Sequence, residues 1–471
     1  MTQGSVSAER LEEFRLGVLG PVLVPGDPGY DEARAAWNGM FDRRPSVIAQ
    51  CMGVADVQAA IAFARANELV IAVRGGGHSP WGGSTIEGGM LIDLSLMRAV
   101  RVDPERRVAV AAAGTLFSEF DRETQVHGLA VTGGMVSHTG IAGLTLGGGM
   151  GRFMRKVGLT CDNVLGFDIV TADGAWRHVD ADNHPDLFWA LRGGGGDVGI
   201  VTHFEYKLYP LGPLVYGGYL GWPLAQSKEV LSSLREEIES APDELQVEFL
   251  MLRAPEADFV PAELQGQPAL MLIITWMDND HDAGARNIAP FREKVAPTMD
   301  IVGPFPYTLL QAGADVLAPP GRRVYSWPGF LPDLPDEVVD ISLAHMAKKT
   351  SPLALIELNK MGGAVARVPA DETAVPTFRD APWFYIVGTT WTDPAEDEKH
   401  IAWVNEGDAQ LAPFRLPGRY TNFVPEDDDE SIRAAFGEKT SARLAEIKAK
   451  YDPDGVFSLN PNTRVSLAQT A

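Results

Sequence analysis

A histidine stands at the edge of a run of glycines in IAVRGGGHSPWGGSTIEGGMLIDL, residues 71–94. Glycine has no side chain, so its backbone N–H groups can approach a phosphate closely and bind it without lysine or arginine. The imidazole of His78 adds a nitrogen that, when neutral, is a competent nucleophile or base. This pattern predicts a site where a bare backbone binds a large ligand and one imidazole reaches it.

Two further glycine clusters follow, GGMVSHTGIAGLTLGGGMGRFMRKVGLTCDNV at 133–164 and LRGGGGDVGIVTHFEY at 191–206. Each glycine costs about 0.5–1 kcal/mol of backbone entropy relative to alanine within regular structure. Tight turns alone explain any single cluster. Three clusters in one region favour a bound ligand that offsets their cost.

Composition limits the class of protein. The 471 residues favour two or more domains, and 45% apolar and 22% charged residues are ordinary globular values. Lys and Arg number 40 against 63 Asp and Glu, and the net charge of -23 repels nucleic acid and anionic lipid. We therefore expect no nucleic-acid and no membrane partner. Composition leaves both a monomer and a homodimer open.

Targeting and cysteine patterns add two expectations. The N-terminus lacks a basic start followed by an apolar core, which predicts a cytoplasmic protein. The two cysteines, Cys51 and Cys161, each lack a second cysteine nearby, so we expect neither a disulfide framework nor a metal site.

The order of elements around the first glycine run argues against a dinucleotide-binding fold. Residues 53–73, GVADVQAAIAFARANELVIAV, predict a helix with Asp56 as its N-cap and a strand from Leu69 to Val73. The glycine loop then leads to another strand, MLIDL, whereas the dinucleotide fold needs strand, loop and helix. We expect instead a mixed α+β domain with a hairpin at Asp103-Pro104.

The composition of the chain and its pattern of predicted elements change near residue 212 and again near residue 414. Beyond residue 212 glycine thins out, and helices alternate with strands such as PALMLIITWM and PWFYIVGTTW up to residue 414. The tail predicts a helix with Leu444 and Ile447 on one face. We divide the chain into residues 1–212, 213–414 and 415–471.

Four motifs in order carry a family resemblance: RGGGHSPWGGS, GLTLGGGMGRFMRKVGLTCDNV, DLFWALRGGGGDVGIVTHFEY and KAKYDPDGVFSLNPN. They resemble the FAD-linked oxidases related to berberine bridge enzyme, in the vanillyl-alcohol-oxidase flavoprotein superfamily. The resemblance covers nearly the whole chain. It implies an α+β fold with a PCMH-type FAD-binding domain of two α+β subdomains, formed by 1–212 and 415–471. The inserted substrate domain, 213–414, would be an antiparallel sheet covered by helices.

The resemblance also implies the cofactor and its contacts. FAD would be bonded covalently through its 8α-methyl group to His78, as a single 8α-histidyl link. The residues that it places at FAD are Arg74, Gly75, Gly76, Gly77, His78, Ser79, Gly134, Thr139, Gly140, Gly143, Leu144, Gly147, Gly148, Gly149, Asp162, Asn163, Gly199, Ile200, Val201, Asn422 and Asn460.

The segment VSHTG bears on the reaction with oxygen. Many relatives have a cysteine linked to the flavin where this chain has Val136, so we expect one covalent bond only. Thr139 fills the position that tunes oxygen access, and its near-isosteric match to valine favours an oxidase. His138 would approach the reactive face as an acid or base, with structural packing an equal alternative.

The catalytic base does not follow directly from the resemblance. The position of the glutamate of berberine bridge enzyme is held by Arg367. The strand LALIELNKMGGAV puts Glu357 and Asn359 on one face, which makes Glu357 a candidate base, although an exposed glutamate without a role is as probable. Tyr420, in the motif YTNF, is a second candidate.

We expect an enzyme that transfers a hydride from a small organic substrate to flavin N5 and is reoxidised by O2 to give H2O2. Plausible donors are an alcohol, a sugar, an amine or a phenolic or polyketide intermediate. A flavin-dependent oxygenase of specialised metabolism and a silent flavin-binding protein are the alternatives. Four aromatic residues suit an aromatic ligand, but core packing is the commoner reading for such residues: Trp276, Tyr307, Trp327 and Trp391.

Overall fold

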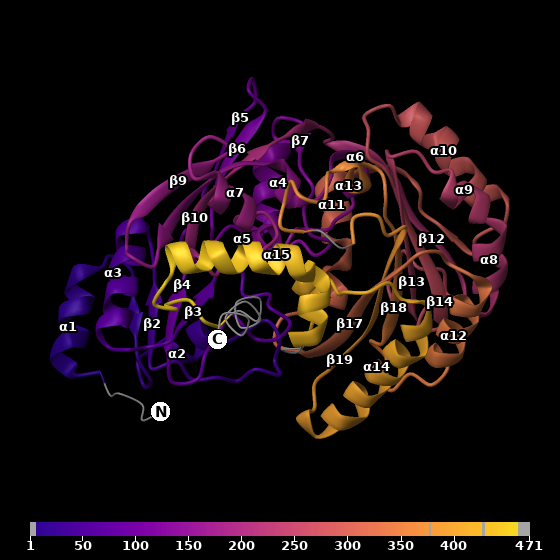
Figure 1. The fold of residues 1–471 in the computed structure, drawn as a ribbon. Coiled ribbons are helices and arrows are strands. Elements are labelled where there is room, and N and C mark those ends of the chain that lie inside the picture. Colours follow the sequence, from indigo (N-terminus) through magenta and orange to yellow (C-terminus); the bar gives the residue numbers. More distant parts are fainter. Residues whose placement is uncertain (1–5, 376–377, 426–428, 460–471) are drawn as a thin grey trace.

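The computed structural model describes residues 6–375, 378–425 and 429–459. Figure 1 shows two halves side by side, with the N-terminal elements through β10 on one side and a large sheet flanked by helices on the other. The last helix, α15, runs back across the N-terminal half. This arrangement agrees with the fold implied by the resemblance.

The first subdomain is a small sheet in the order β1-β2-β4-β3. Strands β2 and β3 both pair with β4 in parallel, and the connection from β3 to β4 is the glycine loop rather than a helix. This confirms the predicted order of elements. The elements are α1 (Ala8–Gly17), β1 (Val22–Leu23), α2 (Tyr30–Arg34), β2 (Val47–Gln50), α3 (Val54–Ala66), β3 (Ile71–Arg74) and β4 (Met90–Asp93).

The predicted cap of α3 is wrong. Gly53 is the N-cap, and Asp56 lies inside the first turn. Its buried carboxylate accepts hydrogen bonds from the backbone N–H groups of Leu19, Gly20 and Met52. Asp56 therefore joins the segment before β1 to the helix, a contact that local spacing does not reveal.

The second subdomain is a sheet in the order β5-β6-β10-β8-β9, in which β5 and β6 form the predicted hairpin. The alanines of β6 are buried under the neighbouring strands and helices. Its elements are β5 (Val100–Asp103), β6 (Val108–Ala112), α4 (Phe117–Gln125), β7 (Leu129–Ala130), α5 (Ile141–Leu146), α6 (Met154–Val157), η1 (Thr160–Asn163), β8 (Val164–Thr171), β9 (Trp176–Asp180), α7 (Pro185–Leu191), β10 (Gly199–Lys207) and β11 (Tyr209–Pro210).

An antiparallel sheet in the order β15-β12-β14-β13-β18-β19-β17, with β16 beside β12, is the core of the second half. Its strands alternate between two buried faces, as period-two side chains require. Leu270, Leu272 and Ile274 of β14 pack toward the helices, and Met271 and Ile273 pack on the opposite face. The strands are β12 (Leu214–Pro223), β13 (Leu245–Arg253), β14 (Pro268–Trp276), β15 (Met299–Asp300), β16 (Gly303–Pro306), β17 (Arg323–Leu331), β18 (Leu355–Lys360) and β19 (Trp383–Trp391).

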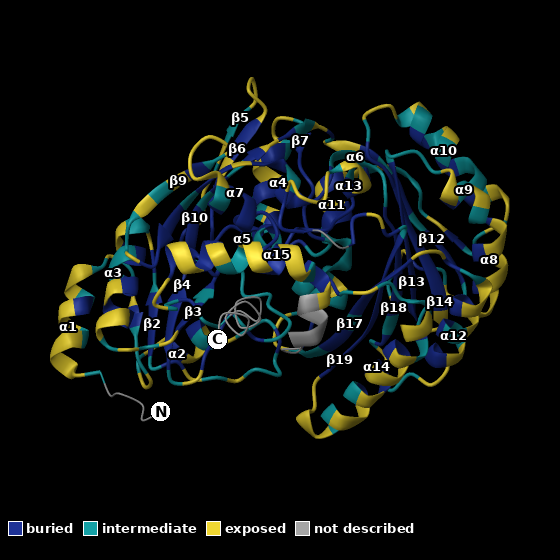
Figure 2. Ribbon diagram, viewed as in Figure 1, coloured by how far each residue is buried: buried dark blue, intermediate teal, exposed yellow. Residues whose placement is uncertain are grey.

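Helices cover one face of this sheet, and Figure 2 shows their exposed outer sides over buried strands. In α14 the buried residues His400, Trp403, Val404, Gly407 and Leu411 recur at helical spacing, which gives the helix one apolar stripe. The helices of this half are η2 (Leu224–Gln226), α8 (Ser227–Ser233), α9 (Arg235–Glu239), α10 (His281–Glu293), α11 (Tyr307–Gln311), η3 (Ala312–Leu317), α12 (Asp336–Met346), α13 (Ala364–Arg367), η4 (Pro394–Glu396), α14 (Asp397–Leu411) and η5 (Ala412–Phe414).

The end of the chain returns to the N-terminal half. After η6 (Thr421–Phe423), helix α15 (Asp429–Tyr451) bends at Gly437, where the backbone φ is 67°. Ile447 and Tyr451 of α15 and Phe457 beyond it join the hydrophobic core of the first two sheets. The tail therefore shares a core with the N-terminal residues, and a further cluster with Met150, Phe384 and Tyr420 joins both to the large sheet.

A buried ion pair links the halves. Arg379, in the connection between β18 and β19, donates to both carboxylate oxygens of Asp162 in η1 at 2.7 and 3.0 Å. The two side chains are 2% and 6% exposed. Removing one partner of such a pair leaves an uncompensated buried charge, which costs about 3–5 kcal/mol.

We expect Asp162→Asn to lower the midpoint of thermal unfolding in the protein with and without cofactor, because Arg379 loses its counter-charge. The control is Glu396→Gln, which breaks the exposed Lys399–Glu396 pair and should lower the midpoint far less, because water screens exposed ion pairs. Equal midpoints for Asp162→Asn and the unmodified protein would contradict the structural role of this pair.

Candidate functional site

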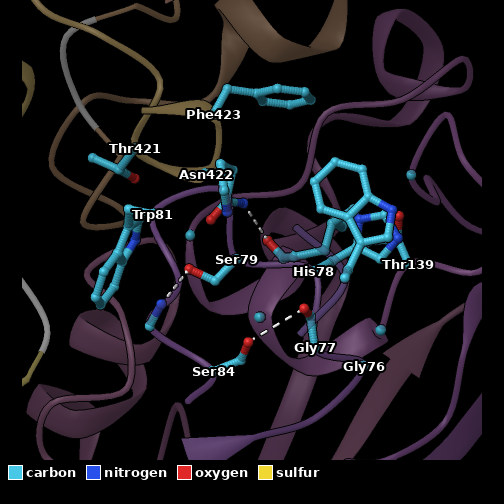
Figure 3. Close-up of a pocket in the computed structure, with 18 of the residues that line it drawn as sticks. Gly76, Gly77, His78, Ser79, Trp81, Ser84, Thr139, Thr421, Asn422 and Phe423 are labelled. Carbon is cyan, nitrogen blue, oxygen red and sulfur yellow. Dashed lines mark hydrogen bonds between the residues drawn. The ribbon is translucent and has the colours of Figure 1, made fainter. Parts of the chain in front are cut away.

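A cavity of about 440 Å³ lies between the glycine segments of the first half and the large sheet of the second. In the close-up of Figure 3, Gly76, Gly77, His78 and Ser79 lie on one side of it, and Thr421, Asn422 and Phe423 come from the C-terminal segment. Strands of the large sheet contribute Glu248, Leu250, Ser326, Leu355, Glu357 and Ile386.

Two glycine segments touch along their backbones at this cavity. A Cβ added to Gly76 would lie 2.4 Å from the backbone of Gly140, and one added to Gly140 would lie 2.4 Å from the nitrogen of Gly76. Gly75 is nearly as tight, with its Cβ position 3.0 Å from the carbonyl oxygen of Ala113. These glycines are required by the approach of one backbone to another.

The side chains of Asn422 and Tyr420 attach the C-terminal segment to the glycine segment at this cavity. Nδ2 of Asn422 donates to the carbonyl oxygen of Leu144 and to the hydroxyl of Tyr420, both at 3.0 Å. A Cβ at Gly147 would lie only 2.0 Å from Oδ1 of Asn422, so this position also excludes a side chain. The segment is thereby held directly on the glycine turn.

Tyr420, the second candidate base, lines the cavity, and its hydroxyl group is bound to the glycine turn. Its hydroxyl oxygen accepts hydrogen bonds from the backbone N–H groups of Gly149 and Met150, at 2.9 and 3.1 Å, in addition to Asn422. Burial raises the pKa of Tyr420 to about 12. The phenol is therefore protonated at neutral pH, and it positions the turn at 147–150.

His78 is held between two rings. Trp37 stacks on one side, with ring centroids 4.3 Å apart, and Nε2 of His78 lies 2.7 Å from Nδ1 of His138. Burial, together with the neighbouring His138, lowers the pKa of His78 to about 3. His78 is therefore neutral, as a nucleophilic imidazole must be.

The VSHTG segment divides its side chains between the cavity and the interior. Val136 and Thr139 line the cavity, whereas His138 lies behind His78 and does not line it. The predicted approach of His138 to a ligand in the cavity is thus replaced by contact with His78. Ser137 is anchored by Asp315 of η3, which accepts from its backbone N–H at 2.7 Å and from its hydroxyl at 2.6 Å.

A group of charged side chains forms the wall opposite the glycines. Val247 and Phe249 of β13 and Ile356 and Leu358 of β18 pack under the helices, so the residues between them face the cavity. Glu357 accepts a hydrogen bond from Asn359, two residues along the same face. The predicted face of Glu357 is confirmed, and the side chain is buried rather than exposed.

Glu248 and Arg152 complete this group. Nε of Arg152 lies 3.2 Å from Oε2 of Glu248, with side chains 1% and 3% exposed. Burial first, and then the charge of Glu248, raise the pKa of Glu357 to about 8, while Arg152 and Asn359 oppose the rise. A carboxyl group with raised proton affinity in a cavity is a candidate acid or base.

Most residues predicted to bind the ligand line this one cavity. They are Gly75, Gly76, Gly77, His78, Ser79, Gly134, Thr139, Gly140, Gly143, Leu144, Gly147, Gly199, Ile200, Val201 and Asn422.

Five predicted residues lie outside the cavity lining and support the backbone. Arg74 binds the carbonyl oxygens of Ala33, Arg34 and Ser84. Asp162 pairs with Arg379, and Asn163 donates to the carbonyl oxygens of Val157 and Leu159. Gly148 and Gly149 provide the positive φ angles, 116° and 87°, of the turn. The predicted Asn460 lies outside the described residues.

Sequence reasoning missed several residues at the site. Trp37 and Trp81 are aromatic residues that line the cavity, and Glu248 and Arg152 form its buried ion pair. A glutamate inside the apolar strand LQVEFLML was a usable signal for Glu248. The aromatic residues considered from the sequence do not line the cavity, and three are buried core residues: Trp276, Tyr307 and Trp391.

Comparison with known proteins matches both ends of the chain. A family model described as FAD binding domain matches residues 45–180, and one described as berberine and berberine like matches residues 402–464. An uncharacterised FAD-linked oxidoreductase of Bacillus subtilis is 30% identical over 93% of this chain and 96% of its own length. The chain belongs to the berberine bridge enzyme-like family of FAD-linked oxidoreductases.

Two further similarities refine this assignment. A FAD-dependent monooxygenase of Fusarium proliferatum is 36% identical over 88% of this chain and 83% of its own length. The crystal structure of 6-hydroxy-D-nicotine oxidase from Arthrobacter nicotinovorans superposes with a TM-score of 0.84 and 27% identity, over 95% of this chain and 98% of that one. The berberine bridge enzyme-like protein is an FAD-dependent oxidoreductase of the PCMH type.

The cavity of this FAD-linked oxidoreductase fits the cofactor. The glycines at 75–77 and 140 expose backbone on its wall. Gly143 gives a second indication, because a Cβ there would meet no protein atom within 4 Å although the residue lines the cavity. Protein packing does not require that glycine, and a side chain there would enter the space available to the cofactor.

The described ranges contain neither a metal-binding cluster nor a membrane-spanning helix. No cluster of three or more His, Cys, Asp or Glu side chains there could hold a metal ion. None of the helices described is long and apolar enough to cross a membrane. Both cysteines are buried as free thiols, and burial raises their pKa values.

Gly140 and Gly143 allow a matched test of the cradle. Gly140→Ala should lower the unfolding midpoint of the protein without FAD and abolish FAD binding, because its methyl group meets the backbone of Gly76. Gly143→Ala should leave that midpoint unchanged or higher, since alanine is favoured in a helix by about 0.5–1 kcal/mol.

Gly143→Ala should nevertheless reduce the flavin content, because the methyl group enters the cavity. Thermal unfolding of the protein without FAD and the flavin-to-protein absorbance ratio measure the two effects. Full flavin content in Gly143→Ala would show that FAD does not lie against this face of α5.

Proposed function

We propose that the protein is an FAD-linked oxidase of a small organic molecule that carries an ionisable O–H or N–H group next to the C–H bond to be oxidised. The observation that supports this is the buried carboxyl group of Glu357, with its raised pKa, in the same cavity as His78 and the glycine segments. FAD supplies the chemistry, accepting a hydride at N5 and passing two electrons to O2 to give H2O2.

The chain supplies position and a proton acceptor. A substrate between the glycine wall and the sheet faces Glu357 from β18 and Glu248 from β13. Glu357 accepts the substrate proton, and its raised pKa makes it a stronger base than an exposed glutamate. Arg152 neutralises Glu248, and Asn359 fixes the carboxylate of Glu357 by donating to it.

We propose that FAD is attached through a single bond to His78. The neutral imidazole and its fixed orientation between Trp37 and His138 support this role. Val136 lines the cavity where many relatives have the second attachment residue, and its side chain cannot form such a bond.

The wall formed by the sheet supports a range of small organic substrates. Glu248, Ser326, Glu357, Thr389 and Thr390 offer polar groups. Between them lie the apolar side chains of Leu250, Leu355 and Ile386. This mixture suits an alcohol, a sugar, an amine or a phenolic or polyketide intermediate, and the 6-hydroxy-D-nicotine oxidase structure supports the reaction class.

A flavin-dependent oxygenase is the second candidate. The similarity to a FAD-dependent monooxygenase over 88% of the chain favours it, and Thr139 lines the cavity in either case. The two functions differ in the fate of oxygen: an oxidase releases both atoms as H2O2, whereas an oxygenase leaves one in the product.

Reaction under 18O2 separates these functions once a panel of donors has identified one that bleaches the flavin anaerobically. We expect one H2O2 for each substrate oxidised and no label from 18O2 in the product. Label in the product would establish the oxygenase, and a flavin that no donor bleaches would contradict both.

Glu357→Gln should lower the turnover number by about 10²–10⁴-fold, because the amide cannot accept the substrate proton. In the unmodified protein, activity should rise with pH through about 8 as Glu357 loses its proton. Steady-state rates from about pH 6 to about pH 10, on either side of the pKa of Glu357, measure both effects.

Glu248→Gln is the matched variant for this pH dependence. It removes the negative charge that helps to raise the pKa of Glu357, so the rising limb should move to lower pH while turnover at high pH is kept. An unchanged limb in Glu248→Gln, or full activity in Glu357→Gln, would remove Glu357 from the role of base.

A further inference from the structure

The pair formed by His78 and His138 is built as one unit. Their nitrogens Nε2 and Nδ1 are 2.7 Å apart, and the ring centroids are 4.7 Å apart with planes tilted by 39°. Two nitrogens at this distance share one proton, so one ring donates and the other accepts. Within the described part of the chain, Nε2 is the one nitrogen of His78 with a hydrogen-bond partner, which leaves Nδ1 for another bond.

Surrounding contacts fix both rings. Trp37 stacks on His78, and its own indole N–H donates to the carbonyl oxygen of Ala318 at 2.8 Å. On the other side, Asp315 accepts two hydrogen bonds from Ser137, the residue before His138. Contacts with Asp315 of η3 and with Ala318 after it therefore restrain both rings. Neither ring needs to reorient for a proton to pass between them.

We propose that His138 is a positioning residue for the covalent attachment of FAD: it accepts the Nε2 proton of His78 and so directs the lone pair of Nδ1 at the 8α-methyl carbon. This inference rests on the proposed link between His78 and FAD. It assigns to His138 a role in maturation of the enzyme rather than in turnover, which fits its place behind His78 and outside the cavity lining.

The step balances with dioxygen as the oxidant. One C–N bond forms, between Nδ1 of His78 and the methyl carbon, while one C–H bond of the methyl group and the Nε2–H bond break. The Nε2 proton passes to Nδ1 of His138. The flavin ring system is left reduced by two electrons, and O2 takes these together with the methyl proton and the proton held by His138 to give H2O2. His138 ends as it began, as a neutral imidazole.

The charges around the pair suit this transfer. Burial lowers the pKa of His138, and the carboxylate of Asp315 opposes that change. The other titratable group facing it is His78, whose pKa is lowered to about 3. His138 is therefore unprotonated near neutral pH and available as an acceptor, with Asp315 nearby to stabilise the imidazolium while it exists.

The test uses full-length protein prepared without flavin and mixed with FAD. Samples are quenched in acid at intervals, and intact mass with fluorescence of the denatured polypeptide gives the rate of covalent attachment. We expect His138→Ala to attach FAD at least about ten-fold more slowly, the effect of losing a hydrogen-bonded proton acceptor worth about 1.4 kcal/mol or more. The exposed histidine His127 supplies the control, since His127→Ala should attach FAD at the unmodified rate.

Two further measurements separate this role from structural support. Added imidazole should restore attachment in His138→Ala, and the slowing of attachment at acid pH, seen as His138 becomes protonated, should disappear in that variant. His138→Asn keeps an acceptor for the Nε2 proton but cannot remove it, so it should attach FAD at an intermediate rate.

The outcomes are distinct. If the unmodified protein forms no link to His78, the proposed attachment site fails. If it does form the link and His138→Ala matches its rate, the role of His138 fails while the attachment site stands. If His138→Ala does not bind FAD at all, as flavin fluorescence would show, His138→Asn decides, and an unmodified rate in that variant overturns the proposal.

Discussion

The contact between Gly76 and Gly140 is the constraint on which the rest of the site depends. At this point the loop after β3 meets the start of α5 with no side chain between them, so each backbone fixes the other. His78 lies two residues beyond one partner and Thr139 one residue before the other. The close approach therefore sets the positions of the imidazole and the hydroxyl, and the bare backbone of both segments forms one wall of the cavity.

The opposite wall obeys a different rule, the alternation of side chains in a sheet. Every second residue of β13 and β18 packs against the helices in the hydrophobic core, so the residues between them face the cavity. Placing Glu248 and Glu357 there puts two carboxyl groups in a site with little water, which is costly for their charged forms. Arg152 offsets this for one of them. The same burial that disfavours the charge strengthens the remaining carboxylate as a base.

Local patterns in the sequence were sufficient to predict much of the fold and of the cavity lining. The glycine motifs placed most of the cavity wall, and period-two alternation put Glu357 on the correct face. Contacts between segments far apart in the sequence could not be predicted. Asp56 fits the pattern of a helix cap, but its partners Leu19 and Gly20 lie in the segment before β1. Asp162 and Arg74 lie within motifs that surround the cofactor, yet they bind protein groups. Glu248 and Arg152 come together only where the loop after α5 meets β13, and a single sequence does not specify that contact.

The return of the tail has a consequence for biosynthesis. Tyr420 and Asn422 hold the turn at 147–150 from a segment some distance beyond the large sheet, and Ile447 and Phe457 complete the first hydrophobic core. A nascent chain on the ribosome can form the glycine loops early, but it cannot close the pocket until nearly all of its codons have been read. A chain that ends before this segment therefore cannot complete the wall of the pocket.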